Sequence, residues 1–376
     1  MGASSSLSGI RALDLSQFTP GPYASLMLAD FGADVLKIEP PSGDPQRSDG
    51  PIDSDGIAAS YKVINRGKRV LKLDLKSDEG RASFSKLVQR ADILLESFRP
   101  GVLDRLGFGR KELEALNPRL IHCALSGWGQ TGPYRLRPGH DLNYMALGGG
   151  LIASGSEDTP VMTTPPVADF AGSLLSVTSI LAALHQRERV GVGCFIDVAL
   201  AESVLAWLSI DLTNNKRPGS ELRRARSAYN GGLACYQIYR TADDRFLTLG
   251  IIEEKFWRNF CDAMGRQDWL PRQWEPIPQH KLISELAEAF QEKPLSEWEK
   301  LLDSVETCFH SVVNLEELAG NPQIAARQLL FESKGGDPFS EILLPVCFNG
   351  ESPSPRSALR EITVSDAIAA WELRPR

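Results

Sequence analysis

Short apolar stretches alternate with helix-length segments through the first half of the chain. The helix-length segments at 20–31 and 78–90 carry apolar residues at helical spacing, and Pro20 opens the first of them. The apolar stretches lie at residues 10–15, 35–38, 70–75, 93–95 and 120–125. Strands separated by helices are typical of βαβ units and of a largely parallel sheet. The first half is therefore predicted to be an α/β domain.

The second half begins with apolar helices and then becomes polar. Two helices with the composition of a buried scaffold are predicted over 170–186 and 198–208. The polar segment 214–226 is typical of a linker. We expect a smaller α+β domain after it, with a hairpin formed by 235–239 and 245–250 and helices near 254–264, 280–292 and 295–304.

Composition narrows the functional classes. The chain has 376 residues, of which 42% are hydrophobic, so it is long enough to bury a sizeable core and to form two domains. A net charge of -7 argues against a general nucleic-acid binder. No apolar run approaches the ~20 residues of a membrane helix, so no membrane partner is expected. Six dispersed cysteines without a CxxC pair favour a reducing, cytoplasmic setting over disulfides or a zinc site.

Two ionisable residues stand out between Ser126 and Gly172. His140 lies in a Gly-His-Asp loop, where Asp141 can orient the ring or favour its protonated form. Asp169 directly precedes a predicted helix and is an N-cap candidate, which stabilises the anion and makes it a weaker base than an unshifted carboxylate. Spacing alone leaves catalytic and structural roles open for both. One base on each side of a carbon is what inversion next to a carbonyl requires.

The glycine-rich segment 127–132 matches the GxGxxG pattern of dinucleotide-binding proteins. A true fingerprint opens a helix and is followed by an acidic residue about twenty positions later. Here Pro133 and Pro138 bracket the next segment, and residues 151–154 supply no acid. A nicotinamide cofactor is therefore not expected.

Several longer sequence motifs in the chain resemble those of a known family. Gly139-His-Asp-Leu-Asn-Tyr144 and Ala168-Asp-Phe-Ala-Gly172 closely resemble the α-methylacyl-CoA racemases, which belong to the class III CoA-transferase superfamily. Further motifs that resemble those of the superfamily lie at residues 21–24, 30–39, 65–69, 73–76 and 98–107. The resemblance is clear over roughly residues 9–260 and faint beyond.

The resemblance implies a fold and an assembly. The fold is a large α/β domain with a Rossmann-like parallel sheet plus a smaller α+β domain, and the chain finally returns to the large domain. Two chains are expected to interlock as a homodimer whose active site forms between subunits. The expected division is a large CoA-binding domain at 1–213, a linker at 214–226, a small domain at 227–325 and the return at 326–376.

The resemblance also implies an acyl-CoA substrate. By position, the slot for the CoA nucleotide would be lined by Thr19, Leu73, Lys76, Arg99 and Arg105. One departure is that racemases often have an arginine where this chain has Pro40, so either Arg47 replaces that cation or the 3′-phosphate of CoA is held less tightly. We expect no metal and no redox cofactor, because the histidines and cysteines form no ligand cluster and proton transfer beside a thioester needs none.

Two reactions fit the resemblance. In a racemase, His140, helped by Asp141, would serve one face of the α-carbon of a 2-methylacyl-CoA and Asp169 the other. Glu253 matches a family glutamate thought to contact the histidine. In a class III CoA-transferase, Asp169 would attack the thioester and form an aspartyl anhydride. Transferases of the superfamily usually have another residue at position 140, so His140 favours the racemase; a non-catalytic acyl-CoA binder is least favoured, because both residues are present.

Overall fold

The computed structural model describes residues 5–333 and 336–372, which divide into two compact units. The large unit comprises the chain up to residue 148, residues 165–204 and the chain from 319 onward. The small unit comprises 149–164 and 205–318. These bounds differ from the sequence-based division: 149–164 and 205–226 are grouped with the small unit, and 319–325 with the large unit.

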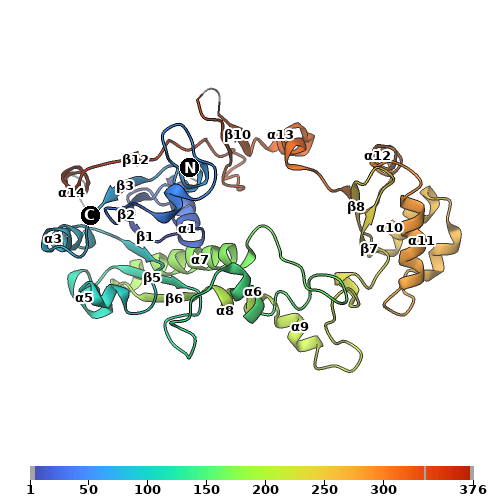
Figure 1. Cartoon of the computed structure of the whole chain (residues 1–376), viewed down its shortest axis with the longest axis horizontal. Helices are drawn as coiled ribbons and strands as arrows, with labels where there is room; N and C mark the ends of the chain where they lie inside the picture. The colour runs from blue at the N-terminus through green and yellow to red at the C-terminus, as the bar shows by residue number, and fades with distance from the viewer. Residues whose placement is uncertain (1–4, 334–335, 373–376) are drawn as a thin grey trace. The chain divides into compact units, whose positions relative to one another are not determined.

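A seven-stranded parallel sheet forms the centre of the large unit (Figure 1). Its strand order is β12-β3-β2-β1-β4-β5-β6. Leu13 of β1 lies opposite Leu36 of β2 and Leu94 of β4, and all three are fully buried. The strands are β1 Arg11–Leu15, β2 Asp34–Glu39, β3 Arg69–Lys72, β4 Ile93–Glu96, β5 Ile121–Ser126, β6 Phe195–Ala199 and β12 Arg360–Glu361. The predicted α/β fold with a parallel sheet is confirmed.

Local sequence explains how the helices of the large unit begin and pack. The side chain of Ser77 caps α3 by accepting a hydrogen bond of 3.0 Å from the Gly80 amide, and Phe84 of the same helix is fully buried. The helices that begin in the large unit are α1 Pro20–Asp30, α2 Ala59–Ile64, α3 Asp78–Val88, α4 Val102–Arg105, α5 Arg110–Leu116, α6 Asp141–Leu147, α7 Val167–Val190, α8 Leu200–Trp207, α13 Pro322–Arg327 and α14 Val364–Glu372. Trp371 of α14 completes the core cluster around Phe84.

Three predicted boundaries were wrong. The helix predicted at 198–208 begins with the last residues of strand β6, because the apolar strand runs without a turn signal into α8. The strand predicted at 70–75 ends at Lys72, since the Asp74 side chain accepts the Lys76 amide in a turn. The helix predicted at 170–186 is longer, Val167–Val190.

Helix α7 also corrects the expectation that no segment reaches membrane-spanning length. Within the described residues, α7 alone is long and apolar enough to cross a membrane. Half of its most apolar stretch is buried inside the protein. The Ser173 hydroxyl donates to the carbonyl of Pro20 (2.6 Å), and Phe170 packs edge-on against Tyr23 (4.7 Å). These contacts with α1 are those of a core helix.

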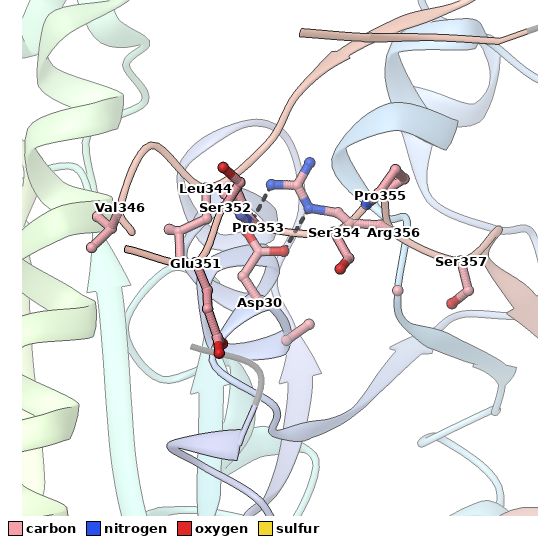
Figure 2. A pocket seen from close by; sticks show the side chains of 12 residues that line it. Asp30, Leu344, Val346, Glu351, Ser352, Pro353, Ser354, Pro355, Arg356 and Ser357 are labelled. Atoms are coloured by element: carbon pink, nitrogen blue, oxygen red, sulfur yellow. Dashed lines mark hydrogen bonds and ion pairs between the residues drawn. The ribbon is translucent and has the colours of Figure 1, made fainter. Parts of the chain in front are cut away.

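The C-terminal segment returns to the large unit through long-range contacts. The guanidinium of Arg356 donates two hydrogen bonds, of 2.6 and 2.7 Å, to Asp30 at the end of α1 (Figure 2). The same group pairs with the buried Glu341 at 3.3 Å. A cavity of about 320 Å³ lies beside this ion pair. The antiparallel strands β10 Leu330–Glu332 and β11 Ser340–Ile342 come before Arg356 in the sequence.

The small unit is built on a three-stranded antiparallel sheet of β7 Tyr236–Arg240, β8 Phe246–Gly250 and β9 Phe309–Ser311. The hairpin formed by β7 and β8 was predicted. Its helices are α9 Ser209–Asn214, α10 Glu254–Ala263, α11 His280–Phe290 and α12 Leu295–Leu302. An aromatic core joins the helices to the sheet, with Trp257, Trp269 and Phe290 fully buried.

Candidate active site

The carboxyl ends of β1, β4 and β5 open into a cleft of about 350 Å³. After β1 the chain runs to β2 on one side, whereas β4 lies on the other side, so the strand order reverses here. Ligands of open α/β sheets bind at such a switch point. The lining residues are Gln17, Phe18, Pro20, Ser97, Phe98, Arg99, Pro100, Leu125, Ser126, Gly127, Trp128, Arg135, Arg137, Pro138, Gly139, His140, Asp141, Tyr144, Asp169 and Leu200.

His140 is exposed and lies in the N-cap position of α6. Its backbone amide donates to the side-chain oxygen of Asn143 at 3.0 Å, which fixes the start of the helix. The imidazole lies edge-on to the ring of Phe18, with 6.2 Å between the ring centroids. The ring is therefore presented to the cleft rather than packed into the core.

Asp169 lies on the same cleft but is not the cap of α7. The helix begins at Val167, so Asp169 is its third residue, and Pro166 occupies the N-cap position. Burial, reinforced by the neighbouring Asp141 carboxylate, raises the pKa of Asp169 to about 7. The sequence-based expectation of a weakened base was wrong, because desolvation and a second negative charge outweigh the helix terminus. Near neutral pH this carboxylate can both accept and release a proton.

Asp141 contacts Asp169 and raises its pKa. Its side-chain oxygen accepts a hydrogen bond of 3.1 Å from the Asp169 backbone amide, which ties the start of α6 to the start of α7. The sequence had paired Asp141 with the His140 ring instead. In the structure Asp141 positions the helix that carries the other candidate base and raises its pKa.

Tyr144 and Trp128 form the wall next to these groups, and sequence reasoning did not single them out. The Tyr144 hydroxyl donates to the carbonyl of Gly139 (2.5 Å), and its ring packs edge-on against Trp128 at 4.9 Å. Burial and the nearby Asp169 raise the pKa of Tyr144 to about 12. A Cβ on Gly127 would overlap the Tyr144 ring, so that position of the glycine-rich loop requires glycine for close approach.

Three arginines give the cleft a positive lining. Arg99, Arg135 and Arg137 are exposed, and none of them has an ion-pair partner within residues 5–333 and 336–372. Arg137 stacks on Tyr134 at 3.8 Å from the ring centroid. Unpaired guanidinium groups beside a cleft suit an anionic ligand. Of these three arginines, only Arg99 was predicted from the sequence to bind CoA.

The other positions predicted for CoA follow the carboxyl ends of strands β1, β3 and β4 of the same sheet. Thr19 follows β1, Leu73 and Lys76 follow β3, and Arg105 ends α4 after β4. Lys76 and Arg105 are exposed, Thr19 is half-buried and Leu73 is buried. Their contact with CoA stays a prediction.

Arg47, the suggested replacement for an arginine at position 40, is already paired. Its guanidinium bonds to Glu39 at 2.7 Å and to Glu361 at 2.8 Å. It also stacks on the ring of Tyr61. A phosphate at this place would compete with two carboxylates for the cation.

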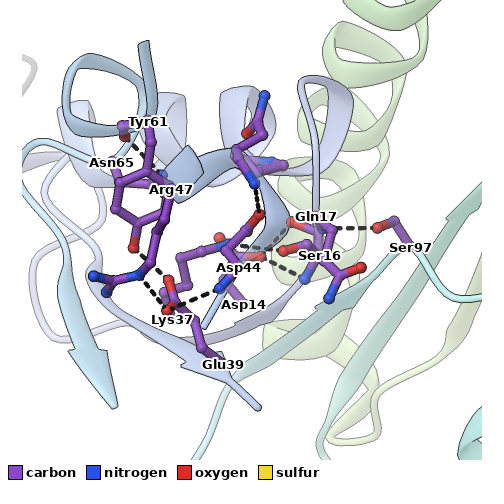
Figure 3. Close-up of polar contacts among 12 residues, drawn as sticks. Asp14, Ser16, Gln17, Lys37, Glu39, Asp44, Arg47, Tyr61, Asn65 and Ser97 are labelled. Carbon is purple, nitrogen blue, oxygen red and sulfur yellow. Dashed lines mark hydrogen bonds and ion pairs between the residues drawn. The ribbon is translucent and has the colours of Figure 1, made fainter. Parts of the chain in front are cut away.

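Buried charges lie beneath the loop that follows β1 (Figure 3). Asp14 accepts hydrogen bonds from Ser16 and Ser25, and Lys68 lies 3.5 Å away. Lys37 pairs with Asp44 at 2.9 Å. Asp14, Lys37 and Lys68 are almost completely buried. Oppositely charged neighbours are what makes such burial tolerable.

Glu253 belongs to the small unit. It is exposed and occupies the N-cap position of α10, just beyond the end of β8. Its predicted contact with the histidine stays a prediction. In the described part of the chain, no group of three or more His, Cys, Asp or Glu residues is placed to hold a metal ion.

The Asp169→Asn variant is expected to be more stable than the wild type at pH 8 and about equally stable at pH 4. The folded protein holds the Asp169 proton more tightly than the unfolded chain, so stability is lost as pH rises from about 4 to 7. Asparagine does not ionise and escapes this loss, which we expect to be roughly 1–3 kcal/mol after solvent screening. Urea unfolding at both pH values measures it, and an equal difference at both would contradict it.

Comparison with known proteins decides the family. The profile of CoA-transferase family III matches residues 7–358. Human α-methylacyl-CoA racemase is 36% identical over 316 residues, which cover 83% of this chain and 79% of the relative. Acetyl-CoA:oxalate CoA-transferase of Acetobacter aceti is 32% identical over 337 residues, covering 87% and 86%.

The chain belongs to CoA-transferase family III. It is therefore an enzyme of this family that acts on acyl-CoA. A crystal structure of a CAIB/BAIF family protein from Brucella suis has a TM-score of 0.84 at 28% identity, covering 98% of this chain and 99% of that one. The likeness in fold thus covers almost all of the chain, while relatives of two reaction types match the sequence to a similar degree.

Proposed function

We propose that the protein inverts the α-carbon of 2-methylacyl-CoA thioesters. The observation that carries the proposal is that an imidazole at the N-cap of α6 and a carboxylate on α7 line one cleft. In the proposed reaction one base removes the C2 proton and the other returns a proton to the opposite face. His140 serves one face and Asp169 the other.

The intermediate of this reaction is an enolate. The electron pair of the broken C–H bond moves to the thioester oxygen, which needs nearby hydrogen-bond donors. We assign that role to backbone N–H groups of the loops that line the cleft. When the acid on the opposite face delivers its proton to C2, the thioester is restored and the configuration is inverted.

The pKa of Asp169, raised to about 7, supports a two-way proton transfer. A base works best when its pKa lies near the operating pH. An ordinary aspartate would give up its proton too readily to serve well as the acid in the reverse direction. Asp141 and burial supply the change.

CoA transfer is the second candidate. There the Asp169 carboxylate attacks the thioester carbonyl, the C–S bond breaks, and CoA leaves as a thiolate from an acyl-aspartyl anhydride. The thiolate then attacks the aspartyl carbonyl of the anhydride, which releases the first acid as a carboxylate and leaves CoA on Asp169 as a thioester. An acceptor carboxylate attacks that thioester, and the displaced thiolate attacks the acceptor carbonyl, so the acceptor leaves as its CoA thioester and the Asp169 carboxylate is restored. The Acetobacter aceti relative supports this reaction, whereas His140 on the cleft supports the racemase.

One incubation distinguishes the two reactions. The protein is incubated with a single 2-methylacyl-CoA epimer in deuterated water, and we expect deuterium at C2 together with the opposite epimer. One parallel sample contains a free carboxylate acceptor, and a separate one contains hydroxylamine, which traps an acyl anhydride as a hydroxamate. Movement of CoA to the acceptor without exchange of the C2 proton would refute the racemase proposal.

The cleft arginines are proposed to bind the anionic CoA part. The Arg99→Ala variant is expected to raise KM for acyl-CoA about 10-fold, because it loses one partly solvated charge-assisted contact. Steady-state kinetics measure the change. Arg189→Ala, which removes an exposed arginine from the last turn of α7, is the matched control. An unchanged KM in Arg99→Ala would count against the assignment.

We also propose that the protein is an interlocked homodimer in the cytoplasm. Leu174 and Leu175 of α7 are exposed apolar residues, which supports a covered surface. Sedimentation at micromolar concentration is expected to show a dimer; a monomer would argue against a site shared between subunits.

All six cysteines are free, which supports the proposed location in a reducing compartment.

A further inference from the structure

The backbone of Phe18 adopts an unusual conformation at the edge of the cleft. Its φ is +62°, in the left-handed region that bulky side chains rarely adopt. Its side chain is 47% exposed and lines the cleft. A strained residue that keeps a large apolar ring at the surface is poorly explained by packing alone.

Buried contacts on the preceding residues fix this turn. The amide of Ser16 donates to Asp14 (2.9 Å), and the ammonium of Lys37 donates to the carbonyl of Ser16 (2.7 Å). The amide of Gln17 donates to the hydroxyl of Ser97 (2.9 Å), as the dashed lines in Figure 3 show. Strained backbone persists where its surroundings determine it in this way. The charges beneath the cleft therefore hold Phe18 in place.

The ring of Phe18 meets the ring of His140. Their centroids are 6.2 Å apart and their planes lie at 86°, which is the edge-to-face geometry favoured by aromatic pairs. His140 is exposed at the start of α6, where its side chain also faces the Asn143 backbone in a capping box, so the Phe18 ring is a further contact of the imidazole. The contact joins the loop after β1 to the residue that begins α6.

We propose that Phe18 is a positioning residue for His140. The strained turn presents the ring of Phe18 to the imidazole, and the contact holds the imidazole in the orientation that faces the cleft. Its consequence for catalysis rests on the proposed racemase function. The ring contact itself does not depend on which reaction the enzyme performs.

Glycine at position 18 is the most informative substitution. Phe18→Gly removes the ring, and glycine accepts the positive φ without strain. Phe18→Tyr keeps the ring and its edge. Gln328→Gly is the matched control, because Gln328 also has a positive φ (+53°), at the end of α13 and outside the cleft lining. Both glycine variants are expected to raise Tm slightly, so a change of function cannot be attributed to loss of stability.

NMR of the imidazole reports the contact directly. The ring signals of His140 are assigned by their absence from His140→Ala. Phe18→Gly is expected to shift and broaden them, whereas Phe18→Tyr and Gln328→Gly leave them near their wild-type positions. Unchanged His140 signals in Phe18→Gly would overturn the proposal. If Phe18→Gly does not fold, Phe18→Leu replaces it, since leucine keeps apolar bulk without a ring, and wild-type signals in that variant would also overturn the proposal.

Deuterium exchange at C2 reports the consequence for one face only. The epimer that loses exchange in His140→Ala identifies the face served by His140. Phe18→Gly is expected to slow exchange of that epimer roughly 10–100-fold, the cost of a small misplacement of a catalytic group. Exchange of the other epimer, served by Asp169, should stay within about 3-fold by the same argument. Equal losses on both faces would contradict positioning through His140, whereas a wild type without C2 exchange would refute the racemase and leave the NMR result standing.

Discussion

Replacing either proposed base by alanine is expected to reduce epimerisation by roughly 10²–10⁴-fold, the usual contribution of a positioned general acid or base. Inversion requires one group on each face, so His140→Ala and Asp169→Ala should be similarly severe. Chiral separation of the products measures the rate. His185→Ala is a matched control, because it removes an exposed histidine from α7, the helix that also carries Asp169.

The two variants should differ in the exchange that they retain. Each keeps one base, so each should still exchange the C2 proton of one epimer, and the two should retain opposite epimers. A CoA-transferase would give another pattern, in which Asp169→Ala is inactive and His140→Ala remains active. Complete loss of exchange from both epimers in each single variant would contradict independent bases.

The pH dependence of the proposed reaction follows from Asp169. As a base it must be ionised, so removal of a proton by Asp169 should weaken as pH falls through about 7. As an acid it must be protonated, so the opposite direction should weaken as pH rises through the same range. Rate profiles measured from each epimer separately test this, and identical acid limbs in the two directions would count against the assignment.

Local pattern was enough to predict the central strands and helices of the large unit. β1, β2, β4 and β5 are short apolar segments bounded by turn residues, and their identity does not depend on distant partners. Two elements of the sheet were missed for a physical reason. β12 has two residues and exists because it pairs with β3, and β6 is an edge strand that merges with an apolar helix. Long-range pairing carries no local signal.

The candidate site was predictable in its members and less so in its chemistry. His140 and Asp169 were identified from two sequence motifs, and the fold brings both residues to one cleft. The direction of the Asp169 pKa shift was wrong, because it depends on burial and on Asp141, which only the packing of α6 against α7 reveals. Phe18 and Tyr144 were missed as site residues for the same reason. Their significance lies in contacts rather than in spacing.

The buried charges beneath the cleft yield a stability prediction. Asp14→Asn is expected to lower the free energy of unfolding by about 3–5 kcal/mol, the usual cost of leaving a buried charge without its partner. Burial opposes ionisation of Asp14, but Lys37, Lys68 and two serine hydroxyls outweigh it and lower its pKa. Without that carboxylate, the buried Lys68 loses the attraction that favours its charged form, and it must give up its proton when the chain folds. Urea unfolding at pH 7 measures the change.

Asp78→Asn is the matched control for this substitution. Asp78 forms an exposed ion pair with Arg81, so its removal should cost no more than about 0.5 kcal/mol. A small effect of Asp14→Asn, equal to that of the control, would contradict the role of the buried network.

The loss in Asp14→Asn should depend on pH through Lys68. Burial lowers the pKa of Lys68 to about 7 in the wild type, despite the attraction of Asp14. Above pH 8 that lysine is largely neutral in the folded protein, so less attraction is lost when Asp14 is replaced. Below pH 7 the wild type gains from a charged pair that the variant lacks. The variant should therefore lie further below the wild type at pH 6 than at pH 9, and adding Lys68→Met should restore part of the loss at pH 6, because methionine has no amine that must lose its proton when the chain folds.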